Sequence, residues 1–485
     1  MSDVKKVVKG KSLEITRRES LNEMLWNTAK EHPEKPCVSF YEAERLRSIS
    51  YSEFWNLIER ISKGLIEIGV KRGDRVAILS STRYEWELFD FAIMCAGAIV
   101  VPIHTTLSES IVRYILEDSG SKLVVVENKE LERKIGDLDL EKIEIEDKRS
   151  IENLLKLGEE SKVDFEKIWR SVRPDDISSI VYTSGTTGEP KGATLTHWNW
   201  RFNALSVMSI TPFYPGESYI CYLPLSHVFQ RLVFYAGVSK GANAVFTSPA
   251  RFLETLRAVK PVAFVGPPIP GVMEAIAEDG EILVKGENVM IGYWNKPYET
   301  QKCFTEDGWF KTGDLGDFDD EGYLIFLGRK KHIIALDTGK KVSPSRIEEL
   351  LLQNPYINDA LIVGDGKPYL VALIVPNFAL LLDLLEKIGI SYEKNKLVVS
   401  KSVSGDVEIT EIPENIVENP RVLEFYSNII KQVNENLSEE EKIRKFRLLN
   451  RTFTIERNEL TPTLKKRTHV ILERYRDLID DLYSQ

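Results

Sequence analysis

The chain of 485 residues contains few cysteines and few histidines, and neither type forms a recognisable cluster. Cys37, Cys95, Cys221 and Cys303 are scattered along the sequence, with no C-x-x-C pair. This pattern argues against a disulfide framework and is typical of a protein from a reducing compartment. The six histidines show no spacing suited to zinc, so these two residue types predict no metal site.

Long apolar runs and an excess of positive charge are also missing. The longest apolar run, residues 91–103, is interrupted by Gly97 and Pro102, so it predicts a buried helix followed by a strand and not a membrane span. With 74 acidic and 64 basic residues, the formal net charge of −10 argues against a nucleic-acid partner. The N-terminus lacks the apolar core of a secretory signal, and we expect a cytoplasmic protein.

The sequence does contain a glycine- and hydroxyl-rich loop, residues 182–192, which directly follows a strand-like run. Glycine lets backbone N–H groups bend around an anion, the hydroxyls add donors or a metal ligand, and the lysine adds a mobile charge. The loop lacks the spacing of a Walker motif, because Glu189 and Pro190 precede its lysine, so we interpret it as another type of polyphosphate loop. Its candidate binding residues are Thr183, Ser184, Gly185, Thr186, Thr187, Gly188 and Lys191.

Short β-branched runs alternate with helical stretches on both sides of this loop. Such alternation predicts an α/β fold with largely parallel strands. Thr196 is expected to cap a helix whose apolar face includes Trp200, Leu205 and Met208. The charge-rich residues 127–167 are expected to form surface loops and short helices.

The pattern changes towards the C-terminus and predicts a second domain. Beyond residue 281, turns closely flank the expected strands, which indicates a more antiparallel region. After Lys331 the sequence predicts a strand, a helix, a strand pair and a helical tail. We therefore expect a large N-terminal domain of mixed, largely parallel sheets with helices, residues 1–330, and a small α+β C-terminal domain, residues 331–485.

Four further motifs follow the loop: Leu223-Pro-Leu-Ser-His227, Gly308-Trp-Phe-Lys-Thr-Gly-Asp314, Gly328-Arg-Lys-Lys331 and Leu460-Thr-Pro-Thr-Leu-Lys465. With residues 182–192 they resemble, in order, the motifs of the adenylate-forming superfamily of AMP-binding enzymes. That superfamily contains acyl-CoA synthetases, luciferases and peptide-synthetase adenylation domains. The last two motifs are most similar to those of AMP-forming long-chain fatty acyl-CoA synthetases, and the resemblance extends from about Leu21 to the C-terminus.

The resemblance implies a long-chain fatty acid–CoA ligase. Such an enzyme adenylates a fatty acid with ATP, releases pyrophosphate, and then forms a thioester with CoA. The implied partners are a fatty acid, ATP and CoA, and the implied cofactor is Mg²⁺, held in part by Thr183. A long-chain acyl substrate is compatible with peripheral membrane contact, although the sequence shows no clearly basic amphipathic helix.

The resemblance also implies roles for single residues. Lys465 matches a lysine that contacts the carboxylate and α-phosphate during adenylation; by itself it would be a charged helix end. His227 matches a position near the acyl carboxylate, with a core or turn histidine as the alternative. Asp314, expected in an exposed turn, matches the acceptor of both ribose hydroxyls. Arg329 matches a ribose or phosphate contact, and its alternative is an interdomain ion pair.

Two further positions concern the second half-reaction. Lys331 matches the hinge about which the smaller domain of the family rotates, which requires a change in φ and ψ. A solvated surface lysine is the alternative. Gly339 and Lys340 match a loop implicated in CoA contact, but Lys341 stands where related chains often carry a neutral residue.

One family motif is missing from residues 226–313, the Tyr-Gly-x-Thr/Ser-Glu segment whose ring covers adenine and whose glutamate holds Mg²⁺. Around Pro267–Pro268 the chain passes from a segment resembling the strand before a long helical region to one resembling the region after it. We interpret this as an internal deletion. Lost strands would expose ladder edges and core side chains, which favours aggregation or pairing in a homodimer.

Two interpretations therefore stay open. The first is an active ligase, and the second is a truncated, non-catalytic relative that binds nucleotide or acyl ligand, or self-associates, without turnover. A peptide-synthetase module is less consistent, because it predicts a carrier domain and only twenty residues follow Lys465. The acyl chain length is not predicted, since the segment expected to line its tunnel is absent.

Overall fold

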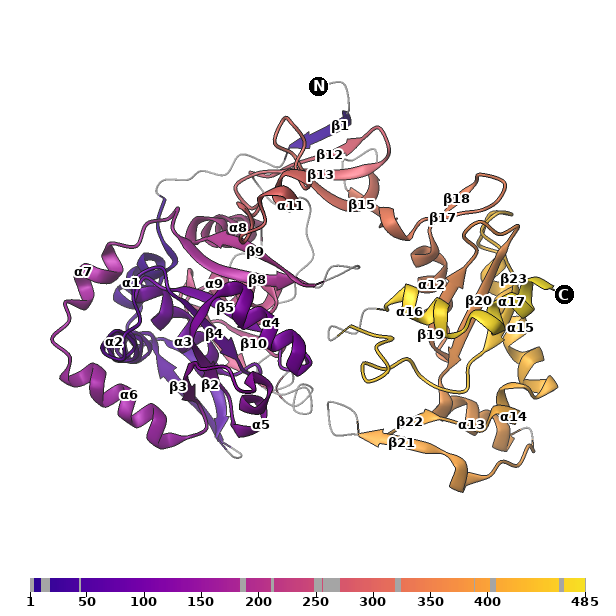
Figure 1. The fold of residues 1–485 in the computed structure, drawn as a ribbon, viewed down its shortest axis with the longest axis horizontal. Coiled ribbons are helices and arrows are strands. Elements are labelled where there is room, and N and C mark those ends of the chain that lie inside the picture. Colours follow the sequence, from indigo (N-terminus) through magenta and orange to yellow (C-terminus); the bar gives the residue numbers. More distant parts are fainter. Residues whose placement is uncertain are drawn as a thin grey trace. The chain divides into compact units, whose positions relative to one another are not determined.

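The computed structural model describes residues 4–9, 18–42, 45–183, 189–210, 213–247, 255, 271–318, 324–387, 389–401, 407–461 and 466–484. The chain divides into two compact units, residues 1–275 with 283–311 and residues 276–282 with 312–485. Each unit mixes helices and strands, as the α/β interpretation predicts (Figure 1). Among the residues of those ranges, no helix is both long and apolar enough to cross a bilayer.

The elements of the first unit are β1 Val4–Lys9, α1 Leu21–Glu31, β2 Pro36–Glu42, β3 Arg45–Ser50, α2 Tyr51–Glu67, β4 Arg75–Leu79, α3 Tyr84–Cys95, β5 Ile99–Ile103, α4 Glu109–Ser119, β6 Ser121–Val126, α5 Lys129–Glu132, η1 Arg133–Ile135, β7 Glu141–Glu144, α6 Lys148–Glu160, α7 Phe165–Arg170, β8 Ile177–Thr183, β9 Lys191–Thr196, α8 His197–Ile210, β10 Ser218–Cys221, α9 Val228–Val238, β11 Asn243–Phe246, β14 Gly292–Tyr293 and α11 Pro297–Lys302.

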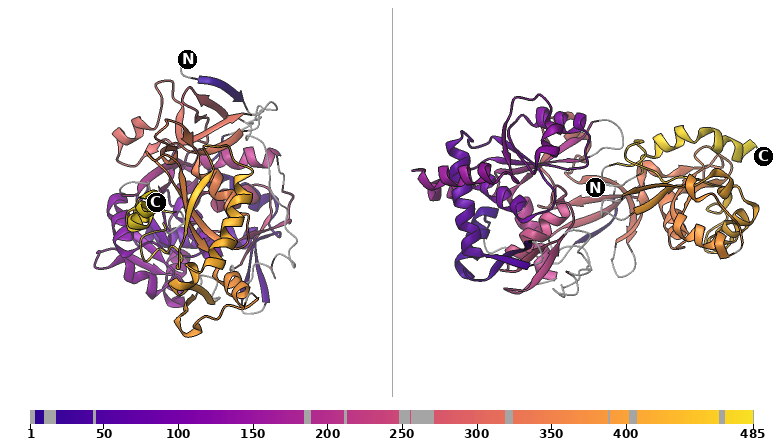
Figure 2. Two further views of the ribbon diagram at one scale, coloured as in Figure 1. Left: turned by 90° about the vertical axis from the view of Figure 1, so that its right-hand side faces the viewer. Right: turned by 90° about the horizontal axis from the view of Figure 1, so that it is seen from below.

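A seven-stranded sheet is central to this unit, in the order β14-β9-β8-β5-β4-β6-β7. Strands β4 to β8 are parallel, whereas β9 and β14 are antiparallel to their neighbours. Both faces are covered: one packs with α3 and α9 through Trp86 and Phe234, and the other with α4 through Val112 and Ile115 (Figures 1 and 2). Two covered faces explain why these strands are continuous apolar runs.

Two local predictions around this sheet are confirmed. The apolar run at 91–103 forms the end of α3 and the whole of β5, and every residue of β5 is buried. Thr196 precedes α8 and its Oγ1 accepts a hydrogen bond from the Asn199 backbone N–H at 3.1 Å. Trp200 and Met208 of that helix are buried in the main core, as its predicted apolar face requires, whereas Leu205 is only partly buried and packs on a separate cluster with Trp198 and Phe202.

A second sheet has the order β10-β11-β2-β3, and a buried ion cluster lies in the core that it shares with α3 and α9. The Arg231 guanidinium donates to Asp90 Oδ1 at 2.7 Å, and both side chains are fully buried. The Tyr235 hydroxyl donates to the other oxygen of Asp90. The rings of Trp86 and Trp200 lie 5.2 and 4.8 Å from the guanidinium carbon, so cation–π contacts complete its surroundings.

The expectation of loops and short helices at residues 127–167 is only partly right. This stretch contributes β7, which forms an edge of the seven-stranded sheet, and the 13-residue helix α6. Helix α6 packs closely on α2, since a Cβ at Gly158 would lie 1.7 Å from the carbonyl oxygen of Arg60. Only Leu154 and Gly158 of α6 are buried, so the sequence carries little apolar signal for this contact.

The chain passes between the two units through β12 Met273–Ala277, β13 Glu281–Lys285 and β15 Phe310–Phe318, which belong to a sheet ordered β1-β12-β13-β15-β16. The other elements of the second unit are β16 Leu324–Arg329, η3 Lys330–His332, β17 Ile334–Ala335, β18 Lys341–Val342, α12 Pro344–Leu352, β19 Ile357–Val363, β20 Leu370–Pro376, α13 Phe378–Lys387, η4 Lys394–Lys396, β21 Val398–Lys401, β22 Val407–Glu411, α14 Glu414–Val417, α15 Pro420–Asn434, β23 Ile443–Leu448, α16 Thr468–Arg474 and α17 Arg476–Ser484.

The predicted helix and strand pair after Lys331 are confirmed as α12, β19 and β20. The predicted helical tail is only partly right: the tail contains helices α13 to α17, but β21 and β22 form a hairpin and β23 pairs in parallel with the buried β20. The charged sequence Ile-Arg-Lys-Phe-Arg-Leu hid this strand. The Lys445 side chain donates to the Leu482 carbonyl oxygen of α17, and Arg447 pairs with Asp481 of the same helix.

His197 generates a testable property of the first unit. It is buried at the start of α8, and its Nδ1 has no hydrogen-bond partner in the described part of the chain. Burial lowers the pKa of His197 from 6.5 to about 4, despite an opposing effect of Asp176. The unfolded chain therefore binds a proton at a higher pH than the folded protein does, and stability falls as the pH decreases through this window.

The free energy of unfolding of wild type is expected to fall by up to about 3 kcal/mol between neutral pH and pH 4 because of His197. We expect His197→Gln to remove this decrease. Urea unfolding followed by tryptophan fluorescence measures this, because all eight tryptophans lie in the first unit. His32→Gln, at a partly exposed histidine of the same unit, is the control. Parallel pH profiles for wild type and His197→Gln would contradict the assignment.

Candidate functional site

The two ends of the predicted phosphate loop lie at the edge of the seven-stranded sheet where its parallel strands end. Thr183 is the last residue of β8 and Lys191 the first of β9, and the two are paired in the antiparallel register. The exposed Thr183 places its Oγ1 3.5 Å from the Lys191 carbonyl oxygen. This edge is where α/β sheets usually bind ligands. Outside the described residues lie Ser184, Gly185, Thr186, Thr187 and Gly188.

Lys191 has a carboxylate partner that sequence reasoning missed. Its ammonium forms an ion pair with Glu299 of α11 and lies 5.5 Å from the centre of the Tyr293 ring. The nearby charge lowers the pKa of Glu299. Both side chains keep about a third of their surface exposed, so an incoming anion can reach this lysine. Their separation of more than 100 residues left no sequence signal for the pair.

His227 caps α9, and its loop is tied to the core on both sides. Nδ1 of His227 accepts from the Phe229 N–H at 3.4 Å. At the other end of the loop, the Leu223 N–H donates to Gln230 Oε1 at 3.3 Å and the Leu223 carbonyl accepts from Thr82 Oγ1 at 2.7 Å. The imidazole is thus exposed on a fixed turn at the start of α9, which excludes a core position and leaves its predicted role near the acyl carboxylate untested.

A second histidine, His104, was missed by sequence reasoning. It follows β5, and Nδ1 accepts from the Thr106 backbone N–H at 3.2 Å. Burial lowers the pKa of His104, and the neighbouring His227 and Lys134 lower it further. A polar residue directly after a fully buried strand was the available signal, because loop residues at strand ends commonly carry function.

Asp314 and Arg329 form an ion pair across two strands of the second unit. Asp314 lies in β15 opposite Arg329 in β16, and Arg329 Nε is 2.7 Å from Asp314 Oδ1. The expectation that Asp314 sits in a turn is therefore wrong. A register shift between Leu315 and Gly316 bends the strand there, and Gly313, whose φ is +73°, precedes it. Glycines that suggested a turn serve an irregular strand instead.

A buried carboxylate, that of Glu281, binds the residue that precedes Asp314 in this ion pair. Glu281 accepts from the Gly313 N–H at 2.9 Å and from the Lys330 ammonium at 2.9 Å. Lys330 also bonds to Asp279 at 2.5 Å, and that contact lowers the pKa of Asp279. The residue before the predicted hinge is therefore held by two carboxylates.

The predicted hinge and CoA residues lie close together in sequence. Lys331 belongs to η3. Gly339, with φ +78°, lies in the turn that joins β17 and β18, where its N–H bonds to Leu336 O at 2.8 Å. The Lys340 ammonium pairs with Glu440 at 2.9 Å and is mostly exposed. These positions are compatible with the predicted roles but do not test them.

Lys465 lies outside the described residues, whereas its neighbour Lys466 lies within them. The Lys466 ammonium bonds to Glu348 at 2.7 Å, to Asp359 at 3.1 Å and to the Ala360 carbonyl. The backbone of Lys466 also forms an antiparallel bridge with Leu460. Of the two adjacent lysines, Lys466 is therefore committed to the interior of the unit and is not available to a substrate.

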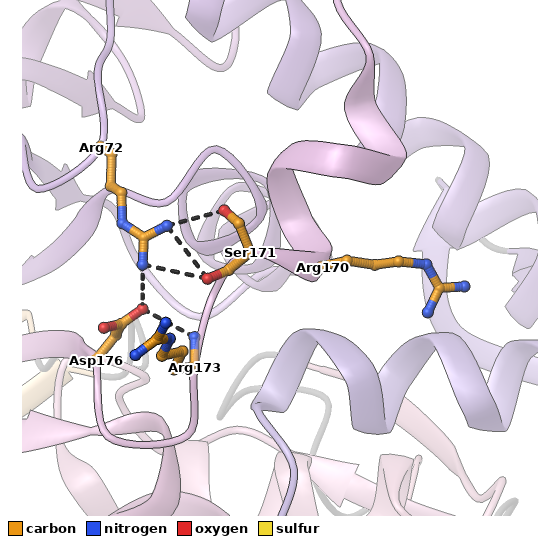
Figure 3. A pocket seen from close by; sticks show the side chains of 5 residues that line it. All are labelled: Arg72, Arg170, Ser171, Arg173 and Asp176. Atoms are coloured by element: carbon orange, nitrogen blue, oxygen red, sulfur yellow. Dashed lines mark hydrogen bonds and ion pairs between the residues drawn. The ribbon is translucent and has the colours of Figure 1, made fainter.

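A cavity of about 530 Å³ lies at the opposite edge of the central sheet, before β8 begins (Figure 3). Arg72 there bonds to Ser171 Oγ at 2.8 Å and to Asp176 at 2.5 Å, so its charge is already compensated. Arg170 points away from these groups and bonds to Glu166. Arg72, Ser171 and Asp176 bond to one another, so the cavity does not have the character of a nucleotide site.

No group of three or more His, Cys, Asp or Glu side chains able to hold a metal is present among the residues with described positions. A nucleotide-bound Mg²⁺ needs fewer protein ligands, because phosphates and water complete its coordination. The exposed hydroxyl of Thr183 fits that mode. The first unit can therefore offer a lysine, a hydroxyl and two imidazoles to ligands, and the second unit can offer a carboxylate and a guanidinium.

Two family models match the chain: AMP-binding enzyme at residues 25–275 and AMP-binding enzyme C-terminal domain at residues 331–387. A long-chain-fatty-acid–CoA ligase, FadD15 from Mycobacterium bovis, is 28% identical over 574 residues, covering 90% of this chain and 92% of that protein. The Bacillus subtilis O-succinylbenzoate coenzyme A synthetase in complex with AMP has a TM-score of 0.67 at 21% identity, covering 92% of this chain and 97% of that one. A Mycobacterium tuberculosis fatty acyl CoA synthetase has a TM-score of 0.60 at 19% identity, with 94% and 98% covered.

We expect Lys466→Met to destabilise the second unit by about 3 kcal/mol, because it leaves Glu348 and Asp359 without a compensating charge. Hydrogen exchange of β19 measures the effect. Lys442→Met removes an exposed ion pair with Glu439 and is the matched control, with an expected cost below about 1 kcal/mol. Equal protection of β19 in both variants would contradict the assigned role of Lys466.

Proposed function

Because the chain belongs to the family of AMP-binding enzymes, we propose that it is a fatty acid–CoA ligase. It would activate a long-chain fatty acid by adenylation with ATP, release pyrophosphate, and pass the acyl group to CoA. The proposal is supported by relatives named long-chain-fatty-acid–CoA ligase and by the fold shared with adenylate-forming enzymes.

One observation carries the proposal: the ends of the phosphate loop, Thr183 and Lys191, are paired at the ligand-binding edge of the parallel sheet. A triphosphate placed there meets the backbone of a glycine-rich loop and one lysine. Lys191 is held by the partly exposed Glu299, and a more highly charged phosphate group competes favourably with a single carboxylate.

The remaining roles follow from chemistry that each group can perform. Asp314 can accept hydrogen bonds from ribose hydroxyls and Arg329 can contact ribose or phosphate, provided their mutual ion pair opens. His227 lies on a fixed turn, where an imidazole can orient a carboxylate. Lys465 would stabilise the negative charge that develops as the carboxylate attacks the α-phosphate.

Mg²⁺ would be held by the Thr183 hydroxyl and by the nucleotide itself, and when bound it would neutralise charge on the phosphates. The glutamate that the family supplies for this purpose has no counterpart in residues 226–313. We therefore propose weaker metal binding than in complete relatives.

For the second half-reaction we propose a rotation about Lys331 that brings Gly339 and Lys340 to CoA. Lys330, the residue before this hinge, is held by Asp279 and Glu281, so the change in φ and ψ would be confined to a short segment. We further propose a cytoplasmic location, with peripheral membrane contact during uptake of the acyl substrate. We also propose that the chain can form a homodimer.

An internal deletion near Pro267–Pro268 favours a second candidate function, a non-catalytic relative that binds ligand without turnover. The alignment with FadD15 extends over 574 residues, more than the 485 of this chain, so part of that relative faces no residue of this protein. We propose that the missing glutamate motif belonged to the deleted segment.

Pyrophosphate release with palmitate, ATP and Mg²⁺ separates the two candidates. A ligase releases pyrophosphate only when the fatty acid is present, and we expect Lys191→Ala to reduce this rate about 100-fold by removing a charge from the phosphate site. Omission of palmitate is the control. ATP binding without any fatty-acid-dependent release would favour the non-catalytic relative.

Lys465→Ala should lower the rate of acyl-AMP formation about 100-fold with little change in ATP affinity, because the lysine ammonium stabilises charge that develops during the reaction. Mass spectrometry of acyl-AMP and ATP titration measure the two effects. Lys442→Ala, at a surface lysine of the same unit, is the control. Undiminished acyl-AMP formation by Lys465→Ala would refute its role.

A further inference from the structure

His104 lies at the same sheet edge as the phosphate loop. Strands β5 and β8 are adjacent and parallel, and Val100 is paired with Ser179. Extending this register along both strands places His104 beside Thr183 of the phosphate loop. Paired residues of parallel strands project to the same face, and Val100 belongs to the core that also contains α9. His104 and His227 therefore belong to one side of the sheet.

The hydrogen bonds of His104 define its tautomer. Nδ1 accepts from the Thr106 N–H at 3.2 Å and lies 2.9 Å from Thr106 Oγ1. A nitrogen that accepts a backbone N–H carries no proton, so the neutral ring has its proton on Nε2. The Nε2–H group is then a donor directed away from the turn that holds Nδ1.

The turn that carries His104 is rigidly held. The Lys134 ammonium donates to the carbonyl oxygens of Thr105 and Leu107, at 2.6 and 2.9 Å. These two carbonyls flank Thr106, the partner of the imidazole. A cation that binds both sides of the turn keeps the ring in one orientation, which a substrate-contacting donor requires.

His227, at the start of α9, is held in the same way, through Nδ1. Its Nδ1 accepts from the Phe229 N–H, and the two imidazoles are close enough for each to disfavour a positive charge on the other. The Nδ1 contact of His227 thus indicates the same tautomer as that of His104, whose Nε2–H donor lies beside Thr183. A hydrogen bond from such a donor to an anionic oxygen is charge-assisted through the acceptor.

We propose that His104 is a second substrate-contacting histidine, whose Nε2–H donates to an anionic oxygen of the reacting groups. That oxygen belongs to the acyl carboxylate or to the α-phosphoryl group, which share this chemistry. The proposal rests on the proposed adenylation reaction and adds to it a residue from outside the recognised motifs. His104 acts as a hydrogen-bond donor only, and no proton is transferred.

The test compares His104→Asn with His104→Gln, because only glutamine places an N–H group near the position of Nε2. We expect His104→Asn to lower kcat/KM for acyl-AMP formation about 10- to 100-fold and His104→Gln to stay within about threefold of wild type. A rise in KM for the fatty acid alone assigns the carboxylate, and a rise in KM for ATP alone assigns the α-phosphoryl group. His32→Gln is the control for loss of a partly exposed histidine.

Unchanged kinetics of His104→Asn, or equal losses in both variants, would overturn the proposal, since equal losses indicate a packing role. If wild type forms no acyl-AMP, the proposed function fails by itself. Equilibrium titrations with ATP and with palmitate then decide the role of His104. Weakened binding of either ligand to His104→Asn, with binding retained by His104→Gln, supports it, and equal affinities of all variants for both ligands overturn it.

Discussion

The fully buried ion pair between Arg231 and Asp90 is the interaction on which the first unit most depends. A guanidinium without solvent is tolerated only with a carboxylate, a hydroxyl and aromatic faces around it, and Asp90, Tyr235, Trp86 and Trp200 supply them. Removing one partner of such a pair costs about 3–5 kcal/mol, a large part of the stability of a typical domain. The pair therefore fixes α9 against α3.

This constraint matters for function because α9 begins at His227. Gln230, one residue before Arg231, bonds back to Leu223, and Thr82 bonds to the same residue from the end of β4. The motif that carries His227 is thus attached to the core by a neighbouring side chain and to the central sheet by another. Burial and the nearby charge of Asp90 raise the pKa of Glu87, and neither of its carboxylate oxygens has a hydrogen-bond partner in the ranges described. Asp90 is therefore the carboxylate that pairs with Arg231.

Charges elsewhere in the protein are paired in a way that leaves the reactive groups reachable. Lys191 and Arg329 are each held by one partly exposed carboxylate, Glu299 and Asp314, which anionic or hydroxyl-bearing ligands can displace. Lys466 and Lys330, by contrast, bond to two carboxylates each, and one of the two is largely buried, Glu348 for Lys466 and Glu281 for Lys330. The single pairs are suited to exchange with a ligand and the double ones to structural support.

The order of the motifs, the α/β character, the largely parallel strands that precede Thr183 and the cap at Thr196 could be predicted from the residues alone, because each depends on local spacing or on glycine and β-branched residues. The sequence also indicated the missing segment between His227 and Asp314. The folded structure was needed to show that Asp314 lies in a strand, that β23 is a strand, that Glu299 pairs with Lys191, and that Glu281 binds the backbone next to Asp314. Those outcomes depend on contacts between residues far apart in the chain. Such contacts stabilise the fold but produce no local pattern or spacing that can be read from the sequence.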